Sequence, residues 1–226
     1  MDVESGPMTQ KASNTATSDY LARHFTNAEG LGARVGLSGA EVEALVDAGL
    51  APQPSYVVAD GRLASAAFGD LEGEELADGA YFHTGMARWL DQALAVGDQE
   101  RLKAAFLAEA DQARSALAAA GWAAPDPETA TVWLEDLWRS HLAGVFGVCV
   151  RQPDRVDQIV LKETLQAILA ERTDNGARAD YGAEEAALIR DVVDRYAAAC
   201  ADFTPVEYPI SSRRRYLEGL RLPPAR

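Results

Sequence analysis

The sequence is poor in the residues that build disulfide frameworks and metal sites. It has two cysteines, Cys149 and Cys200, and three histidines, His24, His83 and His141, which lie far apart. It contains no Cys-x-x-Cys, His-Glu-x-x-His or paired Glu-x-x-His motif. Both cysteines lie among apolar residues at helical spacing, so we expect buried free thiols. We also expect no metal and no cofactor, since a metal site would have to combine residues distant in sequence.

Lysines and long apolar runs are also scarce. Only 3 of the 21 basic residues are lysines, which together with abundant alanine is typical of a GC-rich bacterial source. The 35 acidic residues bring the net charge to −14, which opposes binding to nucleic acid or anionic membranes. No apolar run is long enough to span a bilayer, and residues 1–18 lack the pattern of a signal peptide. We therefore expect a cytoplasmic protein.

Loops that cradle nucleotide phosphates are missing as well. Residues 30–36 approach the Gly-x-Gly-x-x-Gly pattern, but the last glycine is one place late and no strand precedes it. Residues 36–40 do not form the Gly-x-Ser-x-Gly turn of the α/β-hydrolases, and no Walker motif is present. The sequence therefore offers no nucleotide-binding loop and no nucleophile elbow.

Composition and periodicity divide the chain into four parts. Residues 1–17 are expected to be a disordered tail, and residues 67–79, rich in Gly, Asp and Glu, a linker loop. Residues 18–66 show patterns of three helices and a hairpin. In residues 80–226 apolar side chains recur at helical spacing, which predicts a bundle of five or six helices. The expected fold class is mostly α, with a small winged-helix-like unit before a helical bundle.

Local signals support the elements expected in residues 18–66. Ser18 is expected to cap the first helix, and Ser38 with Glu41 has the spacing of a capping box. Asp60-Gly61 lies between two β-favouring runs and predicts a tight hairpin turn. This order of elements resembles a winged-helix module of the MerR-like type. Its third helix is acidic and has no Lys or Arg, so DNA binding is disfavoured, and a structural role or docking of a protein partner is the better alternative.

His141 lies in the middle of an apolar helical stripe. One interpretation is a core histidine whose ring nitrogens bond to neighbouring groups. The other is a general acid or base in a dry pocket, because small shifts bring the pKa of histidine close to working pH. Gly144 and Gly147 follow at short spacing and would let another helix or a ligand approach the backbone closely.

Lys162 and Glu163 lie in the middle of a predicted helix, residues 153–172, that is apolar on nearly every side. Such a helix is usually central in a bundle, and buried charges require partners. The pair is therefore either a structural ion pair or part of a substrate site. In the second case Lys162 binds a carboxylate and Glu163 moves a proton.

Other side chains are candidates for binding a substrate. Tyr56 follows a rigid Pro-Ser turn and is expected to line a pocket between the two units, a common place for a ligand. The further candidates are Tyr81, Trp138 and Cys149, although the aromatic residues at helical spacing also fit a plain core. The basic run 213–215 is expected to be a solvated helix face, with contact to an anion as the alternative.

A further set of landmarks extends over nearly the whole chain beyond the predicted tail. It comprises residues 18–21, 48–56, 81–82 with 89, 141–150 followed by 162–163, and 213–217. Together these segments resemble an uncharacterised, mainly actinobacterial family of natural product biosynthesis proteins. Phe146 stands where the family pattern has tyrosine, so no role for a hydroxyl is carried over at this position. The resemblance implies specialised metabolism and brings no assigned reaction.

These observations lead to two expectations about function. The first is a small-molecule-binding protein of bacterial specialised metabolism, in its catalytic form a cofactor-independent acid–base enzyme of the cyclase, isomerase, lyase or hydrolase type. Its candidate catalytic residues are His141, Lys162 and Glu163. The alternative is a non-enzymatic regulatory protein that docks a partner through the helix-turn-helix-like unit.

Overall fold

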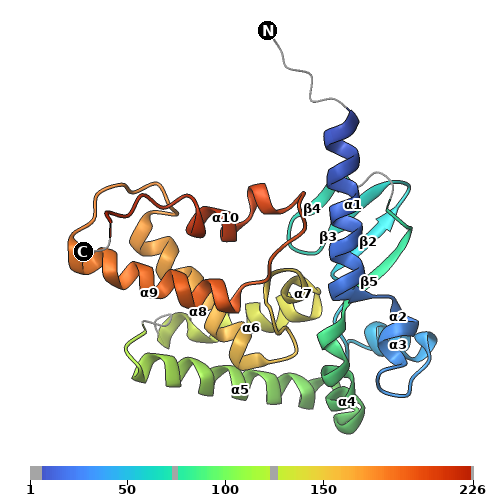
Figure 1. Cartoon of the computed structure of the whole chain (residues 1–226). Helices are drawn as coiled ribbons and strands as arrows, with labels where there is room; N and C mark the ends of the chain where they lie inside the picture. Colours follow the sequence, from blue (N-terminus) through green and yellow to red (C-terminus); the bar gives the residue numbers. More distant parts are fainter. Residues whose placement is uncertain (1–6, 73–75, 123–126, 225–226) are drawn as a thin grey trace.

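The computed structural model describes residues 7–72, 76–122 and 127–224. The helices in these ranges are α1 (Pro7–His24), α2 (Ala28–Gly32), α3 (Gly39–Asp47), α4 (Ala87–Val96), α5 (Gln99–Ala119), α6 (Pro127–Leu142), α7 (Val145–Cys149), α8 (Val156–Thr173), α9 (Ala183–Ala199) and α10 (Ser212–Leu217), with 3-10 turns η1 (Thr84–Met86) and η2 (Tyr208–Ile210). The strands are β1 (Phe25–Thr26), β2 (Tyr56–Ala59), β3 (Arg62–Ser65), β4 (Gly69–Glu72) and β5 (Gly79–His83). The strands and α1–α3 form one end of the molecule, and α5, α8 and α9 form the other (Figure 1).

The expected fold class, mostly α with a single hairpin, is wrong in its β part. The hairpin is the centre of a five-stranded antiparallel sheet with the order β1-β5-β2-β3-β4. β5 pairs with β2, which places Tyr81 opposite Tyr56, and β4 pairs with β3, which places Gly69 opposite Ser65. The sequence assigns these added strands to the linker loop and to the start of the helical bundle.

The presence of β4 and β5, which the sequence does not predict, has a physical explanation. An isolated hairpin of two short strands is marginally stable, and each of its edges exposes unpaired backbone groups. β4 and β5 pair with these edges although their own sequences, Gly-Asp-Leu-Glu and Gly-Ala-Tyr-Phe-His, alternate only weakly between apolar and polar residues. β5 therefore takes its place by backbone hydrogen bonding to the non-adjacent strand β2, and β4 by pairing with β3 across a short turn, and the alternation within each segment reveals neither pairing.

The first helix also starts earlier than the sequence predicts. α1 begins at Pro7, so Ser18 lies inside the helix and does not cap it, and residues 7–17 of the expected tail are helical. Proline fits the first turn of a helix because its missing N–H has no partner there. Residues 1–6 of the expected tail lie outside the described residues. Tyr20 and Leu21 near the end of α1 are buried against the sheet end of the core.

Other local signals are confirmed. Ser38 and Glu41 form the capping box at the start of α3, with the Ser38 N–H donating to the Glu41 carboxylate at 2.8 Å. The turn between β2 and β3 has positive φ at both Asp60 and Gly61, which suits the twist of a two-residue hairpin. Both cysteines are buried free thiols.

The long helix α8 is central, as its apolar composition predicts. It packs against α5 on one side and α9 on the other. Burial of residues such as Ile159, Val160 and Leu165 on different faces accounts for this position. Among the described residues, no helix has both the length and the apolar character needed to cross a membrane.

Gly144 ends the long apolar stripe that contains His141. Its φ of 78° separates α6 from α7 and turns the chain. The segment 53–55 crosses this turn closely: the Gln53 N–H donates to Leu142 O at 2.8 Å and the Ser55 hydroxyl donates to Gly144 O at 3.0 Å. A Cβ at Gly144 would lie 2.5 Å from Gln53 O. The sequence predicts a close approach to the backbone at Gly144. Residues 53–55, which lead into β2, make this approach.

Gly144→Ala is expected to destabilise the protein more than alanine at a matched glycine. Gly97 has a similar left-handed conformation, with φ of 64°, but open space around its Cβ position. Both alanines strain the backbone, and the clash with Gln53 O should lower the free energy of unfolding of the Gly144 variant by about 2 kcal/mol more. Urea unfolding of the two variants measures this difference. Equal losses of unfolding free energy would contradict the close packing at Gly144.

Candidate functional site

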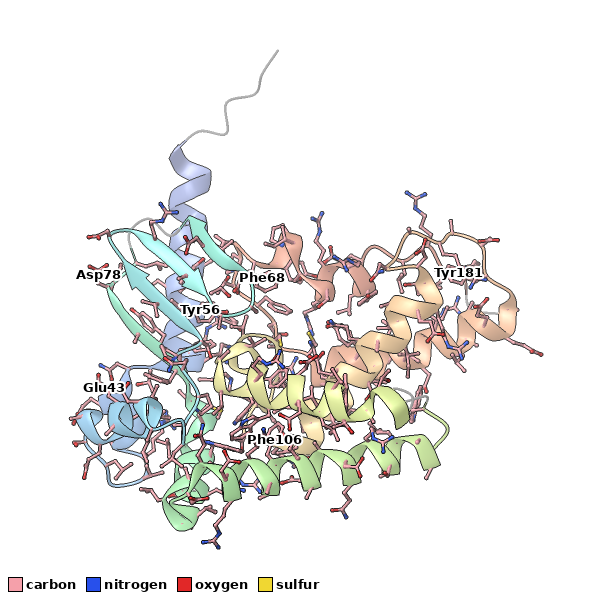
Figure 2. The ribbon with its side chains drawn as sticks, turned by 180° about the vertical axis from the view of Figure 1, so that it is seen from behind. Glu43, Tyr56, Phe68, Asp78, Phe106 and Tyr181 are labelled. Atoms are coloured by element: carbon pink, nitrogen blue, oxygen red, sulfur yellow. The ribbon has the colours of Figure 1, made fainter. Side chains whose placement is uncertain are left out.

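A cavity of about 440 Å³ opens between the sheet end and the helical end of the molecule. We call it the site cavity. Its walls come from the loop after β3, from α6, α7, α8 and α10, and from the loop that contains Phe203. Phe68 stands on the loop after β3, facing the helical end (Figure 2). The volume lies within the range of pockets that hold small organic molecules.

Lys162 and Glu163 meet in the wall of the site cavity. The Lys162 Nζ atom donates to Glu163 Oε1 at 2.8 Å, and the two side chains are 3% and 23% exposed. Burial by itself would lower the pKa of Lys162, but the Cys149 sulfur and the Glu163 carboxylate facing its ammonium raise that pKa above its ordinary value. Lys162 is therefore held as a buried cation behind a carboxylate that reaches the cavity.

Cys149 lines the same cavity and contacts Lys162. Burial raises the pKa of its thiol to about 12, although the Lys162 ammonium acts in the opposite direction. Because the thiolate is the nucleophilic form of cysteine, Cys149 is a poor nucleophile at neutral pH. It contributes shape to the wall and a weak acceptor to the Lys162 ammonium.

A second polar group lies beside the ion pair. The Tyr196 hydroxyl lies 2.8 Å from Ser212 Oγ and donates to Gln166 Oε1 at 3.3 Å, and both partner residues line the cavity. Burial raises the pKa of Tyr196, so its hydroxyl stays protonated. Sequence reasoning missed these residues, although Gln166 lies four residues after Lys162 and so shares its helix face.

His141 lies in a different place from the ion pair. It lines a cavity of about 10 Å³, roughly the room that one water molecule needs. Its ring centroid lies 4.2 Å from that of Trp89 and 5.1 Å from that of Phe106, which Figure 2 labels on α5. The Nε2 atom is buried without a partner among the described residues. Burial lowers the pKa of His141 to about 3, so the ring is neutral at physiological pH.

Phe146 lines both cavities and so stands between them. Consequently His141 does not share a cavity with Lys162 and Glu163, in contrast to the expected catalytic group of three residues. The structure brings Lys162, Glu163 and Cys149 together at the site cavity. The neutral, tightly packed ring of His141 fits a core residue, but among the described residues its Nε2 atom lacks the hydrogen bond that the core interpretation expects.

The remaining predicted binding residues also lie outside the site cavity. Trp138 is buried in the aromatic cluster around His141, with its ring centroid 5.3 Å from that of Phe106. The Tyr81 hydroxyl donates to Ala77 O at 2.7 Å near the surface of the sheet. The Tyr56 hydroxyl donates to Glu207 at 2.7 Å in the core.

Glu207 is a buried acidic residue that sequence reasoning missed. Four hydrogen bonds reach its carboxylate, from the hydroxyls of Tyr56 and Ser65 and from the N–H and hydroxyl of Thr204. Within the described ranges, no basic side chain lies at ion-pair distance from it. Burial together with the negative charge of Glu207 raises the pKa of Tyr56. The spacing Thr-x-x-Glu, which forms a capping box here, is the signal that would have found this residue.

The outer face of α3 is acidic, as the sequence indicates. Glu41, Glu43 and Asp47 are all exposed on it, and Glu43 stands at the outer edge of the α2–α3 pair (Figure 2). This face has the same sign of charge as the DNA backbone. In the described part of the chain, no group of three or more His, Cys, Asp or Glu side chains is placed to hold a metal ion.

Comparison with known proteins gives one match. Residues 102–223 match a family of unknown function, DUF6058. The chain belongs to the DUF6058 family. No curated protein and no solved structure matches it. The match confirms the expectation of an uncharacterised family. It contains the helical walls of the site cavity, whereas Ala67 and Phe68 lie outside it.

Proposed function

We propose that this DUF6058 protein binds a small organic molecule in the site cavity and that Glu163 moves a proton to or from it. The ion pair of Lys162 and Glu163 carries this proposal. A carboxylate that reaches a cavity of this volume, backed by a fully buried ammonium, is the arrangement expected of a positioned acid–base group.

The other polar groups support acid–base chemistry in this cavity. The neutral thiol of Cys149 is unsuited to attack on a substrate at neutral pH. Lys162 acts as a positioning residue, because its hydrogen bond fixes the orientation of the Glu163 carboxylate. Gln166 and Ser212 supply neutral hydrogen-bonding groups for polar atoms of a substrate. A cyclase, isomerase, lyase or hydrolase reaction is compatible with this set of groups.

The biological setting is a further part of the proposal. The resemblance of the landmark segments to natural product biosynthesis proteins supports a role in bacterial specialised metabolism, in the cytoplasm. The substrate would then be a biosynthetic intermediate. The family match neither names a pathway nor assigns a reaction, so a direct test of turnover is needed.

Glu163→Gln is expected to slow turnover by about 100-fold or more, because the amide cannot exchange a proton in the same way. The measurement is mass spectrometry of a metabolite extract from the source organism after incubation with the protein. Glu135→Gln is the matched control, because Glu135 also accepts from a lysine, Lys103, at 2.8 Å but lies outside the site cavity. The wild-type protein and the control variant should consume the same metabolite at the same rate.

Two outcomes would contradict the proposal. One is an extract left unchanged by the wild-type protein, with no metabolite retained by it in native mass spectrometry. The other is equal turnover by the wild-type protein and Glu163→Gln. Retention of a metabolite without turnover would keep the binding part of the proposal and remove the catalytic part.

A further inference from the structure

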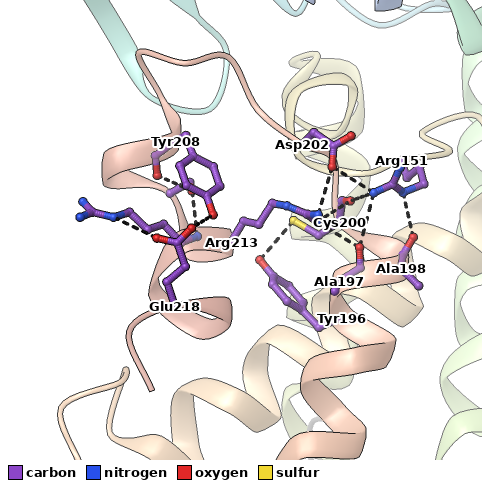
Figure 3. A network of polar contacts seen from close by, with 11 residues as sticks. Arg151, Tyr196, Ala197, Ala198, Cys200, Asp202, Tyr208, Arg213 and Glu218 are labelled. Atoms are coloured by element: carbon purple, nitrogen blue, oxygen red, sulfur yellow. Dashed lines mark hydrogen bonds and ion pairs between the residues drawn. The ribbon is translucent and has the colours of Figure 1, made fainter. Parts of the chain in front are cut away.

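The basic run 213–215 divides into residues with different partners. Arg213 donates to Ala197 O at 3.0 Å and pairs with Asp202 at 3.1 Å, so it caps the end of α9 together with Arg151 (Figure 3). Arg214 donates to Pro209 O at 3.1 Å and lies 3.7 Å from the Glu218 carboxylate. These two arginines are therefore engaged in structural contacts near α10.

Arg215 has no carbonyl or carboxylate partner of this kind among the described residues; its guanidinium lies 6.0 Å from the centroid of the Tyr216 ring. It is exposed, lines the site cavity, and has no carboxylate within ion-pair distance in the part of the chain that the structure describes. Its stem lies against the loop between α8 and α9, where a Cβ at Gly176 would lie 3.1 Å from the Arg215 Cγ atom. Packing of the stem restricts where the guanidinium can lie, and the guanidinium remains available for an anion at the wall of the site cavity.

Of the four charged residues in the cavity lining, Arg215 is the one without an ion-pair partner among the described residues. Glu163 is neutralised by Lys162 at 2.8 Å. Asp136 also lines the cavity and pairs with Arg139 at 3.0 Å. Arg215 is the remaining charged residue of the lining. A ligand with a single negative charge would balance it, and the planar guanidinium matches a carboxylate in geometry.

The side of the cavity toward the sheet is aromatic. Phe68 and Phe203 pack edge to face with their ring centroids 5.6 Å apart, and Trp133 of α6 also lines the cavity. Flat apolar groups bind well to such surfaces. The Lys162–Glu163 pair lies in the wall of the same cavity, so a ligand there would meet both an apolar surface and an acid–base group.

We propose that the ligand is an organic acid with an aromatic or similarly flat apolar body. Its carboxylate binds to Arg215, and its body contacts Trp133 and Phe68, which leaves its reactive part beside Glu163. This inference rests on the proposed function and adds the chemical class of the substrate to it.

The test compares matched acids and amides. Indole-3-acetate and 3-phenylpropionate are titrated against their amides, with the indole N–H signal of Trp133 in ¹⁵N-labelled protein as the readout. Trp133 suits this purpose because it is the one of the four tryptophans that lines the site cavity. We expect each acid to bind about tenfold tighter than its amide, given the usual strength of hydrogen bonds to charged groups.

Arg215→Gln is expected to remove this preference and to leave binding of the amides unchanged. Arg214→Gln is the control, because it changes the net charge equally and lies on the same helix but does not line the site cavity. It should keep the preference for acids. Acids and amides of equal affinity in the wild-type protein, or a preference that survives Arg215→Gln, would overturn the inference and leave the proposed function standing. Failure of both acids and both amides to shift the Trp133 signal at millimolar concentration would also overturn the inference, whereas the proposed function is decided by turnover and retention of metabolites from the extract.

Discussion

Glu207→Leu is expected to lower the free energy of unfolding by about 4 kcal/mol, because each donor left without a partner in the core costs one or more kcal/mol. The carboxylate is fully buried and accepts from Tyr56, Ser65 and Thr204. The first two donors belong to the sheet and the third to the loop before η2. Loss of the carboxylate therefore weakens the attachment of the C-terminal segment to the sheet. Urea unfolding at pH 7 measures the effect.

A double-mutant cycle separates the Tyr56–Glu207 hydrogen bond from general disruption. Tyr56→Phe, Glu207→Gln and the double variant are compared, with an expected coupling of about 1–2 kcal/mol. The chain offers a matched pair at its surface, since the Tyr208 hydroxyl also donates to a glutamate, Glu218. The same cycle at Tyr208 and Glu218 should give a coupling below about 0.5 kcal/mol. Equal couplings in the two cycles would show that the buried carboxylate does not hold the sheet and the loop together.

Acidification from pH 7.5 to pH 5 is expected to cost about 4 kcal/mol of stability through two histidines, at about 1.4 kcal/mol per pH unit for each. Burial lowers the pKa of His141 to about 3. Burial is also the main reason that the pKa of His83 is lowered to about 4. As the pH falls below the ordinary value of 6.5, the unfolded chain takes up these protons and the folded protein does not. Stability is therefore lost as the pH falls, in the window between 6.5 and the folded-state pKa values.

His141→Phe should remove about half of this pH dependence, or about 2 kcal/mol between pH 7.5 and pH 5. At pH 7.5 the change should cost little, because the buried Nε2 atom has no partner among the described residues and the site is lined by aromatic rings. His141→Met serves as a second variant in case the larger ring packs poorly. Urea unfolding at the two pH values gives the result. An unchanged pH dependence in both variants would mean that His141 is protonated in the folded protein.

Several features were predictable because their causes lie within a few residues. The capping box of Ser38 and Glu41 depends on backbone donors three residues apart. The Asp60-Gly61 turn depends on two residues that tolerate positive φ. The central position of α8 follows from apolar side chains on all of its faces. In the first two cases both interacting groups lie within a few residues of each other, and in the third the pattern within the helix shows that all its sides will be covered.

The candidate site was predictable only in part. Lys162 and Glu163 attract attention in the sequence because charges in an apolar helix need partners, and the structure shows that they form one pair at a cavity. His141 also attracts attention as a polar residue in an apolar helix. It lies just before the turn at Gly144, however, and lines a different cavity from the ion pair. Glu207 gives a weak signal, since most glutamates in loops are solvated and two of its donors lie far away in the sheet.

The sequence by itself determined most of the helices, the capping box at Ser38, the hairpin turn and the conflict between charge and burial at Lys162 and Glu163, because these depend on neighbours along the chain. Only the tertiary structure decided the five-stranded sheet, the buried place of Glu207 and the site cavity, whose walls come from segments as distant as Phe68, Trp133 and Arg215. Such features depend on hydrogen bonds and packing between residues far apart in the sequence. Tyr56 and Glu207, for example, are more than a hundred positions apart. No local pattern encodes which distant partner will be met, so the fold itself brings the site together.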